Sequence, residues 1–143
     1  MDADPSELDF ARDPYNGSVS LRAGFLPDPS TLELVVGGDV DVSYLGSGCV
    51  GYATAEPDYR LNWSGSSDEL RIFFVSDDFE DATLIVNRPD GSWTCNDDAG
   101  ATLDPMVVLT DPLEGQYDIW IGSYERDAWL SGELSITELD LEP

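Results

Sequence analysis

Short apolar runs recur along the chain and are separated by turn residues. β-Branched and aromatic residues predominate in these runs, and none has the three-and-four spacing of an amphipathic helix. The runs span residues 18–25, 31–36, 40–45, 59–63, 69–75, 82–87, 92–95, 106–109, 116–124 and 129–139. Short strands with Gly, Pro and Asp between them predict an all-β fold, an antiparallel β-sandwich of jelly-roll-like form.

The first residues of the chain differ from the rest in pattern. They are acidic and broken by prolines, with Leu8 and Phe10 as the possible hydrophobic anchors. We therefore expect a loosely ordered acidic lead-in over residues 1–16 and a single β-sandwich domain over residues 17–143. A chain of 143 residues is long enough for one domain with its own hydrophobic core.

The clearest hairpin in the pattern is centred on Pro89–Gly91, because Pro and Gly suit adjacent turn positions. Residues 82–87 and 92–95 form its two arms. Antiparallel pairing would then place Asn96–Asp98 opposite Asp81–Thr83 at the open end of the hairpin. Like charges that face each other destabilise a sheet, so a cation at this open end would be stabilising.

Calcium is the ion that best fits such a cluster. It accepts six to eight oxygen ligands in flexible geometry, including backbone carbonyls. Mg²⁺ and Zn²⁺ require a stricter coordination geometry. The candidate ligands are Asp81, Asp90, Asn96, Asp97, Asp98 and Asp104, the last of which could close the loop over the ion. The alternative is that these side chains are solvated turn residues, since their order does not match an EF-hand.

Charge limits the partners of the chain. The chain contains thirty acidic residues and six arginines but no lysine or histidine, which gives a net charge of -24. This charge excludes nucleic acid as a partner and disfavours anionic membranes. An acidic solubility coat and cation binding both remain open as explanations. No stretch approaches the roughly 18 apolar residues that a membrane-spanning helix needs.

The absence of His and Lys also limits catalysis. It removes the usual general base, the Ser-His-Asp and Cys-His systems and Schiff-base chemistry. A carboxylate pair of the glycosidase type remains as a catalytic alternative, but any chain with so many carboxylates contains such pairs by chance. We expect a protein that binds and does not catalyse.

Cys49 and Cys95 are the only cysteines. Without His or CxxC spacing they do not form a zinc site, so they are either free thiols or a disulfide, and a disulfide is the preferred interpretation. It would indicate an oxidising compartment, either secreted or periplasmic. Because Met1–Asp4 shows no export signal, export implies that a signal peptide has been removed.

The aromatic residues divide into two groups. Trp63, Trp120 and Trp129 fall within apolar alternation and are predicted to be core residues. Trp93 beside the hairpin turn and Tyr124 at a strand end are positions where an exposed ring could stack on a sugar or a peptide. Asp39 and Asp41 alternate with valines, which predicts an exposed strand face that discourages edge pairing.

Four segments between residues 57 and 124 resemble bacterial pre-peptidase C-terminal (PPC) domains: PDYRLNWSG, ELRIFFVS, DATLIVNRPDGSWTCNDD and GQYDIWIGSY. The resemblance implies a jelly-roll-like sandwich that accompanies exported proteins, assists secretion, stability or substrate attachment, and sometimes binds Ca²⁺. A peptidase activity is not implied, because no catalytic triad can be built without His.

The leading hypothesis is therefore a non-catalytic, calcium-binding accessory domain of an exported protein. The alternative is a protein- or carbohydrate-binding interaction module whose acidic surface holds no specific metal. Nucleic acid and membrane insertion are excluded under both hypotheses.

Overall fold

The computed structural model describes residues 7–78, 80–98 and 103–143. This part of the chain is almost entirely β-structure, with one short 3₁₀ helix, η1 (Val42–Leu45), and no helix long and apolar enough to cross a membrane. The strands are β1 (Ser18–Arg22), β2 (Ser30–Val36), β3 (Val40–Asp41), β4 (Tyr52–Ala53), β5 (Tyr59–Ser64), β6 (Glu69–Ser76), β7 (Ala82–Asn87), β8 (Trp93–Asn96), β9 (Met106–Thr110), β10 (Gly115–Ser123) and β11 (Leu130–Thr137).

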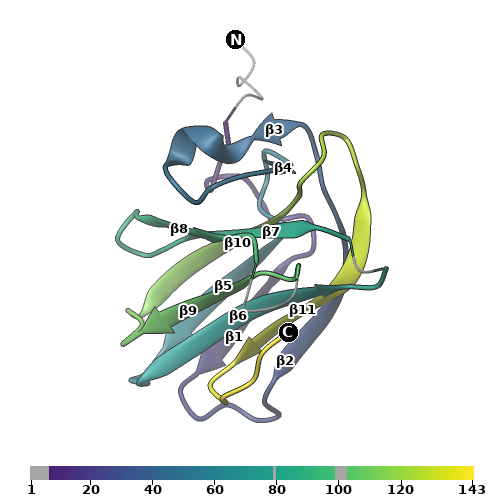
Figure 1. The fold of residues 1–143 in the computed structure, drawn as a ribbon. Helices are drawn as coiled ribbons and strands as arrows, with labels where there is room; N and C mark the ends of the chain where they lie inside the picture. Colours follow the sequence, from purple (N-terminus) through teal and green to yellow (C-terminus); the bar gives the residue numbers. More distant parts are fainter. Residues whose placement is uncertain (1–6, 79, 99–102) are drawn as a thin grey trace.

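The strands form two sheets that pack face to face (Figure 1). One sheet has the order β1-β5-β10-β4-β3, with β7 on the other side of β10 and β8 beside β7. The second sheet has the order β2-β11-β6-β9. The predicted all-β sandwich is confirmed. The pairing is antiparallel except between β1 and β5, which run parallel and are separated in the chain by β2 of the opposite sheet and by β3 and β4 of the same sheet.

The main core lies between the two sheets. Along β6 the side chains of Leu70, Ile72 and Phe74 alternate inward and are fully buried, as the period of two in a strand requires. Leu84 of β7 and Ile121 of β10 meet them from the opposite sheet. Burial of this apolar surface is the main force that holds the two sheets together.

A second hydrophobic cluster covers the outer face of the first sheet. Ile85 of β7 and Trp120 of β10 point away from the main core into this cluster, where Val42, Cys49 and Leu8 join them. β7 is therefore buried on both faces, which explains its continuous apolar sequence. In the predicted lead-in, Leu8 is buried and its backbone N–H donates to the hydroxyl of Tyr44 over 2.8 Å.

The sequence-predicted strand over residues 40–45 is wrong beyond Asp41. The Asp41 carboxylate accepts a hydrogen bond from the backbone N–H of Ser43 over 2.9 Å and thereby caps η1. An Asp before a helical turn supplies an acceptor for the unpaired N–H groups of that turn. Asp41 therefore ends the strand. Asp39 and Asp41 are both exposed, as predicted, but β3 contains only Val40 and Asp41, so the strand is shorter than predicted.

Candidate functional site

The hairpin between β7 and β8 forms as predicted, but its register differs by one residue. Asn96 pairs with Leu84, whereas the sequence placed it opposite Thr83. The turn contains Pro89–Gly91 and is closed by a hydrogen bond from Arg88 N to Ser92 O of 2.8 Å. Gly91 has a φ of 87°, the left-handed conformation that completes a type I turn followed by a bulge.

Three of the predicted calcium ligands act on one another electrostatically at the open end of the hairpin. The pKa of Asp81 is raised, first by burial and then by the negative charges of Asp98 and Asp97. Asp81 Oδ1 is buried and has no hydrogen-bond partner among the described residues. The charges of Asp97 and Asp98 thus act on Asp81 in the direction that the sequence predicted, in addition to the larger effect of its burial.

The other three predicted ligands have structural partners. Asp90 lies in the hairpin turn, at the far end of β7 from Asp81, and accepts hydrogen bonds from Ser92, which lower its pKa. Asn96 accepts from the backbone of Met106 over 3.0 Å, and Asp104 accepts from that of Ser76 over 3.2 Å. The structure thus separates Asp90 from the rest of the predicted ligand set.

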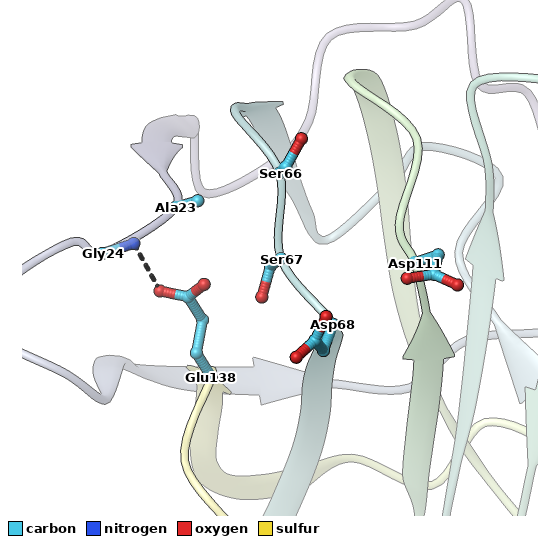
Figure 2. A pocket seen from close by; sticks show the side chains of 7 residues that line it. All are labelled: Ala23, Gly24, Ser66, Ser67, Asp68, Asp111 and Glu138. Atoms are coloured by element: carbon cyan, nitrogen blue, oxygen red, sulfur yellow. Dashed lines mark hydrogen bonds between the residues drawn. The ribbon is translucent and has the colours of Figure 1, made fainter.

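A second acidic group surrounds a hollow of about 480 Å³. Figure 2 shows the carboxylates of Asp68 and Glu138 on facing sides of this hollow, with Asp111 on a neighbouring loop. Glu138 accepts a hydrogen bond from the backbone N–H of Gly24 over 2.7 Å. Across residues 7–78, 80–98 and 103–143, no group of three or more acidic or cysteine side chains is arranged to hold a metal ion.

The tryptophans differ in their exposure. Trp63 and Trp120 are 3% and 0% exposed, so their prediction as core residues is confirmed, whereas Trp129 is 61% exposed and its core prediction is wrong. It precedes β11, whose first residue, Leu130, already points into the core. Of the two predicted stacking positions, Tyr124 is 56% exposed, while Trp93 is half-buried against Trp120 at a ring distance of 5.3 Å.

Trp129 lines a small pocket of about 290 Å³ that the sequence did not predict. We call it the Tyr15–Trp129 pocket. Its lining residues are Tyr15, Asn16, Val35, Thr54, Asp58 and Trp129. Tyr15 is 61% exposed, like Trp129, and Val35 is an exposed residue of β2. Large exposed apolar groups beside a concave surface with a few polar groups are typical of a binding site.

The segment before β1 brings Tyr15 and Asn16 to this pocket. The backbone N–H of Tyr15 donates to Pro57 O over 2.9 Å, and Asn16 donates to Asp58 O from both its backbone and its side chain. Thr54 is held beside them by a hydrogen bond from its hydroxyl to Glu56 O. Hydrogen bonds to backbone carbonyls therefore hold Tyr15, Asn16 and Thr54 in place at the pocket.

The loop between β10 and β11 brings Trp129 to the same pocket. Asp127 N donates to Gly38 O over 2.9 Å, which ties this loop to the end of β2. Gly37 has a φ of 119°, and a Cβ at this position would overlap the carbonyl of Ala128. Only glycine permits this close approach, and it brings Trp129 next to Val35 in the Tyr15–Trp129 pocket.

Asp58 is the charged residue of the pocket. Its side chain is almost completely buried, and its Oδ2 accepts a hydrogen bond from the backbone N–H of Ile121 over 2.7 Å. Burial raises the pKa of Asp58 to about 7, the Ile121 hydrogen bond opposes this shift, and the negative charge of Glu56 adds to it. Strongly shifted carboxyl groups in a pocket are characteristic of functional sites.

The predicted disulfide between Cys49 and Cys95 is confirmed, with an S–S distance of 2.03 Å. It links the loop after η1 to β8 and is part of the second hydrophobic cluster. A disulfide of this kind fits an exported or periplasmic location, because reducing compartments keep thiols unpaired.

No family model matches this chain, and no curated protein matches it. Among solved structures, the Aeromonas hydrophila protein PliG, a periplasmic lysozyme inhibitor of g-type lysozyme, aligns with a TM-score of 0.41 at 11% identity. The alignment covers 88% of this chain and 98% of that chain. The resemblance to PPC domains stays a prediction.

Sequence reasoning missed the residues that build the Tyr15–Trp129 pocket. Tyr15 and Asn16 fall in the predicted lead-in, and Thr54 lies just after β4, a two-residue strand too short to leave a pattern. Asp58 directly precedes β5, where an acidic residue is ordinarily a solvated turn residue. Its burial depends on the packing of β10 beside it, which no local pattern encodes.

Proposed function

We propose that this chain is a non-catalytic binding module of an exported protein, and that it binds a basic protein partner at the Tyr15–Trp129 pocket. The observation that carries the proposal is the pair of largely exposed aromatic rings, Tyr15 and Trp129, on one pocket of a strongly acidic surface. The proposal therefore favours the alternative function from the sequence, an interaction module with an acidic surface.

The aromatic rings supply the affinity in this proposal. Trp and Tyr are enriched among the residues that contribute most to protein interfaces. Their placement beside Val35 gives a small apolar patch with polar groups beneath it, the arrangement of an interface anchor with a pocket. The backbone hydrogen bonds from Tyr15 to Pro57 and from Asp127 to Gly38 fix the segments that carry the two rings and keep the surface preorganised.

The net charge of the chain determines which protein partners it attracts. The net charge of -24 repels acidic proteins and attracts basic ones, and such steering raises association rates at low salt. Arg12, Arg60 and Arg71 are in ion pairs with carboxylates, so half of the positive charge is already neutralised. A neutral glycan would gain nothing from this field, which is why we favour a basic protein.

Binding of synthetic probes tests the proposal. We expect a fluorescent peptide of alternating glycine and arginine to bind the intact protein, with an affinity that falls steeply as salt is added. The matched glycine–glutamine and glycine–glutamate peptides should bind much more weakly. Saturation should also change the emission of Trp129, with Trp129→Phe as the control that loses the change.

A neutral hexasaccharide serves as the competing probe in the same titration. If the saccharide binds at the pocket while the arginine peptide does not, the ligand is a glycan and our proposal is wrong. If neither the peptide nor the saccharide binds, the pocket is not a binding site of this kind.

Calcium binding at the hairpin is a second candidate, supported by the buried, unpartnered Oδ1 of Asp81. Asp81, Asp97 and Asp98 would hold the ion, which would neutralise their mutual repulsion. Among the described residues, no three carboxylates are arranged to hold a metal ion, so calcium would need backbone oxygens as ligands or a local rearrangement. Thermal unfolding with and without Ca²⁺ tests this candidate.

A further inference from the structure

Asp58 lines the Tyr15–Trp129 pocket and forms no ion pair with the described residues. Asp58 is 2% exposed, and its Oδ2 is used by the Ile121 N–H. A buried carboxylate without a positive partner is costly, and a cation that reached it would gain a strong interaction.

The groups around Asp58 do not supply that cation. Glu56, whose charge contributes to the raised pKa of Asp58, is itself negative. Arg12 is engaged with Glu56 at 3.3 Å, and the hydroxyl of Tyr15 also hydrogen-bonds to Glu56. Arg60 pairs with Asp118 at 2.7 Å. The arginines nearest to this region therefore already have acidic partners.

The rim of the pocket suits the stem and charge of a basic side chain. The rings of Tyr15 and Trp129 attract cations through their π faces, with Trp the best of the aromatic residues for this contact. Val35 offers an apolar surface for methylene groups, since long basic side chains bury their stems and leave their charged ends for polar partners. The Thr54 hydroxyl and the Asn16 side-chain carbonyl are further acceptors in the lining.

We infer that a basic side chain of the partner, an arginine or a lysine, enters the Tyr15–Trp129 pocket with its charged end against Asp58. Its stem contacts Val35 and the two aromatic rings. This inference rests on the proposed function and gives it a specific recognition element. The cavity of about 290 Å³ is at the small end for ligand pockets, which fits a single side chain better than a whole small molecule.

The ionisation of Asp58 provides a readout that a purely structural role would not move. A bound cation stabilises the charged carboxylate, so it should lower the pH at which Asp58 titrates. The titratable and charged groups around it are Glu56, Tyr15 and Arg12, and the neutral citrulline probe controls for any change that contact with the pocket causes in them. The shift can therefore be assigned to the probe.

The test is ¹³C NMR of the Asp58 side-chain carboxyl, assigned with Asp58→Asn and followed across pH. The probes are the N-acetyl methylamides of arginine, of lysine and of citrulline, the neutral analogue of arginine. We expect the arginine or lysine probe to lower the titration midpoint by about half a pKa unit or more, and citrulline to leave it unchanged. Comparison of the arginine and lysine probes shows whether the pocket prefers a guanidinium or an ammonium group.

A second arm uses the glycine–arginine peptide with two single-charge variants. Asp58→Asn should weaken binding about tenfold, whereas Asp90→Asn, which removes the same charge at the exposed hairpin turn, should change it less than about twofold. If the peptide binds the wild type but the Asp58 midpoint does not move with either cationic probe, the inference is overturned and the proposed function stands. If the peptide does not bind the wild type, the proposed function itself fails.

Discussion

A hydrogen bond joins Asp58 and Ile121, and in it the Asp58 carboxylate accepts from a backbone N–H that no neighbouring strand pairs. Asp58 Oδ2 accepts from Ile121 N over 2.7 Å, on the edge of β10 between its pairing with β5 at Ile119 and with β4 at Ser123. A backbone N–H left unpaired there would be costly. The same residue therefore completes the sheet and lines the Tyr15–Trp129 pocket.

The double role of Asp58 predicts a specific pH dependence of stability. Its pKa is about 7 in the folded protein, against an ordinary value of 3.8. The folded state therefore binds this proton more tightly, so the contribution to the free energy of unfolding is fully present below about pH 4 and is lost as the pH rises to 7. The loss corresponds to roughly 4 kcal/mol at most.

Asp58→Asn should remove this dependence, because the amide is neutral and its oxygen can still accept from Ile121. Urea unfolding at pH 5 and pH 8 measures the effect as the difference between the two proteins, which cancels the titration of the other carboxylates. We expect the variant to gain stability relative to wild type as the pH rises. A difference that stays constant with pH would show that Asp58 titrates normally.

Arg60 and Asp118 form a cross-strand ion pair between β5 and β10, with an Nε–Oδ1 distance of 2.7 Å. Asp118 is buried, and Arg60 also donates to the carbonyls of Phe10 and Arg12. Arg60→Leu leaves a buried charge unpaired and should cost about 3–5 kcal/mol in urea unfolding. Arg22→Leu, at an exposed position of β1, is the control and should change stability by less than about 0.5 kcal/mol. Equal effects would contradict a structural role for the pair.

The disulfide between Cys49 and Cys95 should be a large contributor to stability. Its sequence separation of 46 corresponds to about 4 kcal/mol in the loop-entropy treatment. Replacement of both cysteines by serine should lower the free energy of unfolding by about that amount at neutral pH. A loss below about 1 kcal/mol would show that the second hydrophobic cluster holds the loop without the crosslink.

Calcium should raise the melting temperature if the hairpin binds it. Calcium at about 100 times its Kd would add about 2.7 kcal/mol to the free energy of unfolding. Asp81→Asn should remove the gain, and Asp90→Asn should keep it, because Asp90 lies at the other end of the hairpin. NaCl at the same ionic strength controls for screening. An unchanged melting temperature, or a gain that survives Asp81→Asn, would exclude the hairpin site.

The sequence was sufficient for the sandwich but not for the pocket. Residues 82–87 and 116–124 were predicted as strands because their apolar runs are strong, and β7 and β10 are indeed buried on both faces. Trp129 was misassigned because it directly precedes the alternation of Leu130 and Leu134 and is separated from it only by the strand boundary.

Sequence reasoning mispredicted the helical turn at Val42 and missed Asp58, because the contacts that determine their structure are distant in sequence. The helical turn at Val42 forms against the second hydrophobic cluster, which residues from β7 and β10 also build. Asp58 is buried through Ile121, which lies 63 residues later in the chain. Single-sequence patterns report the period of a strand, and they do not report which strands become neighbours.

The most direct test of the central claim compares two aromatic variants. Trp129→Ala and Tyr124→Ala each remove a largely exposed ring, but only Trp129 lines the Tyr15–Trp129 pocket. Binding of the glycine–arginine peptide, measured by fluorescence anisotropy at low salt, should weaken about tenfold in Trp129→Ala and less than about twofold in Tyr124→Ala. Equal affinity for the two variants would contradict the assignment of the binding site.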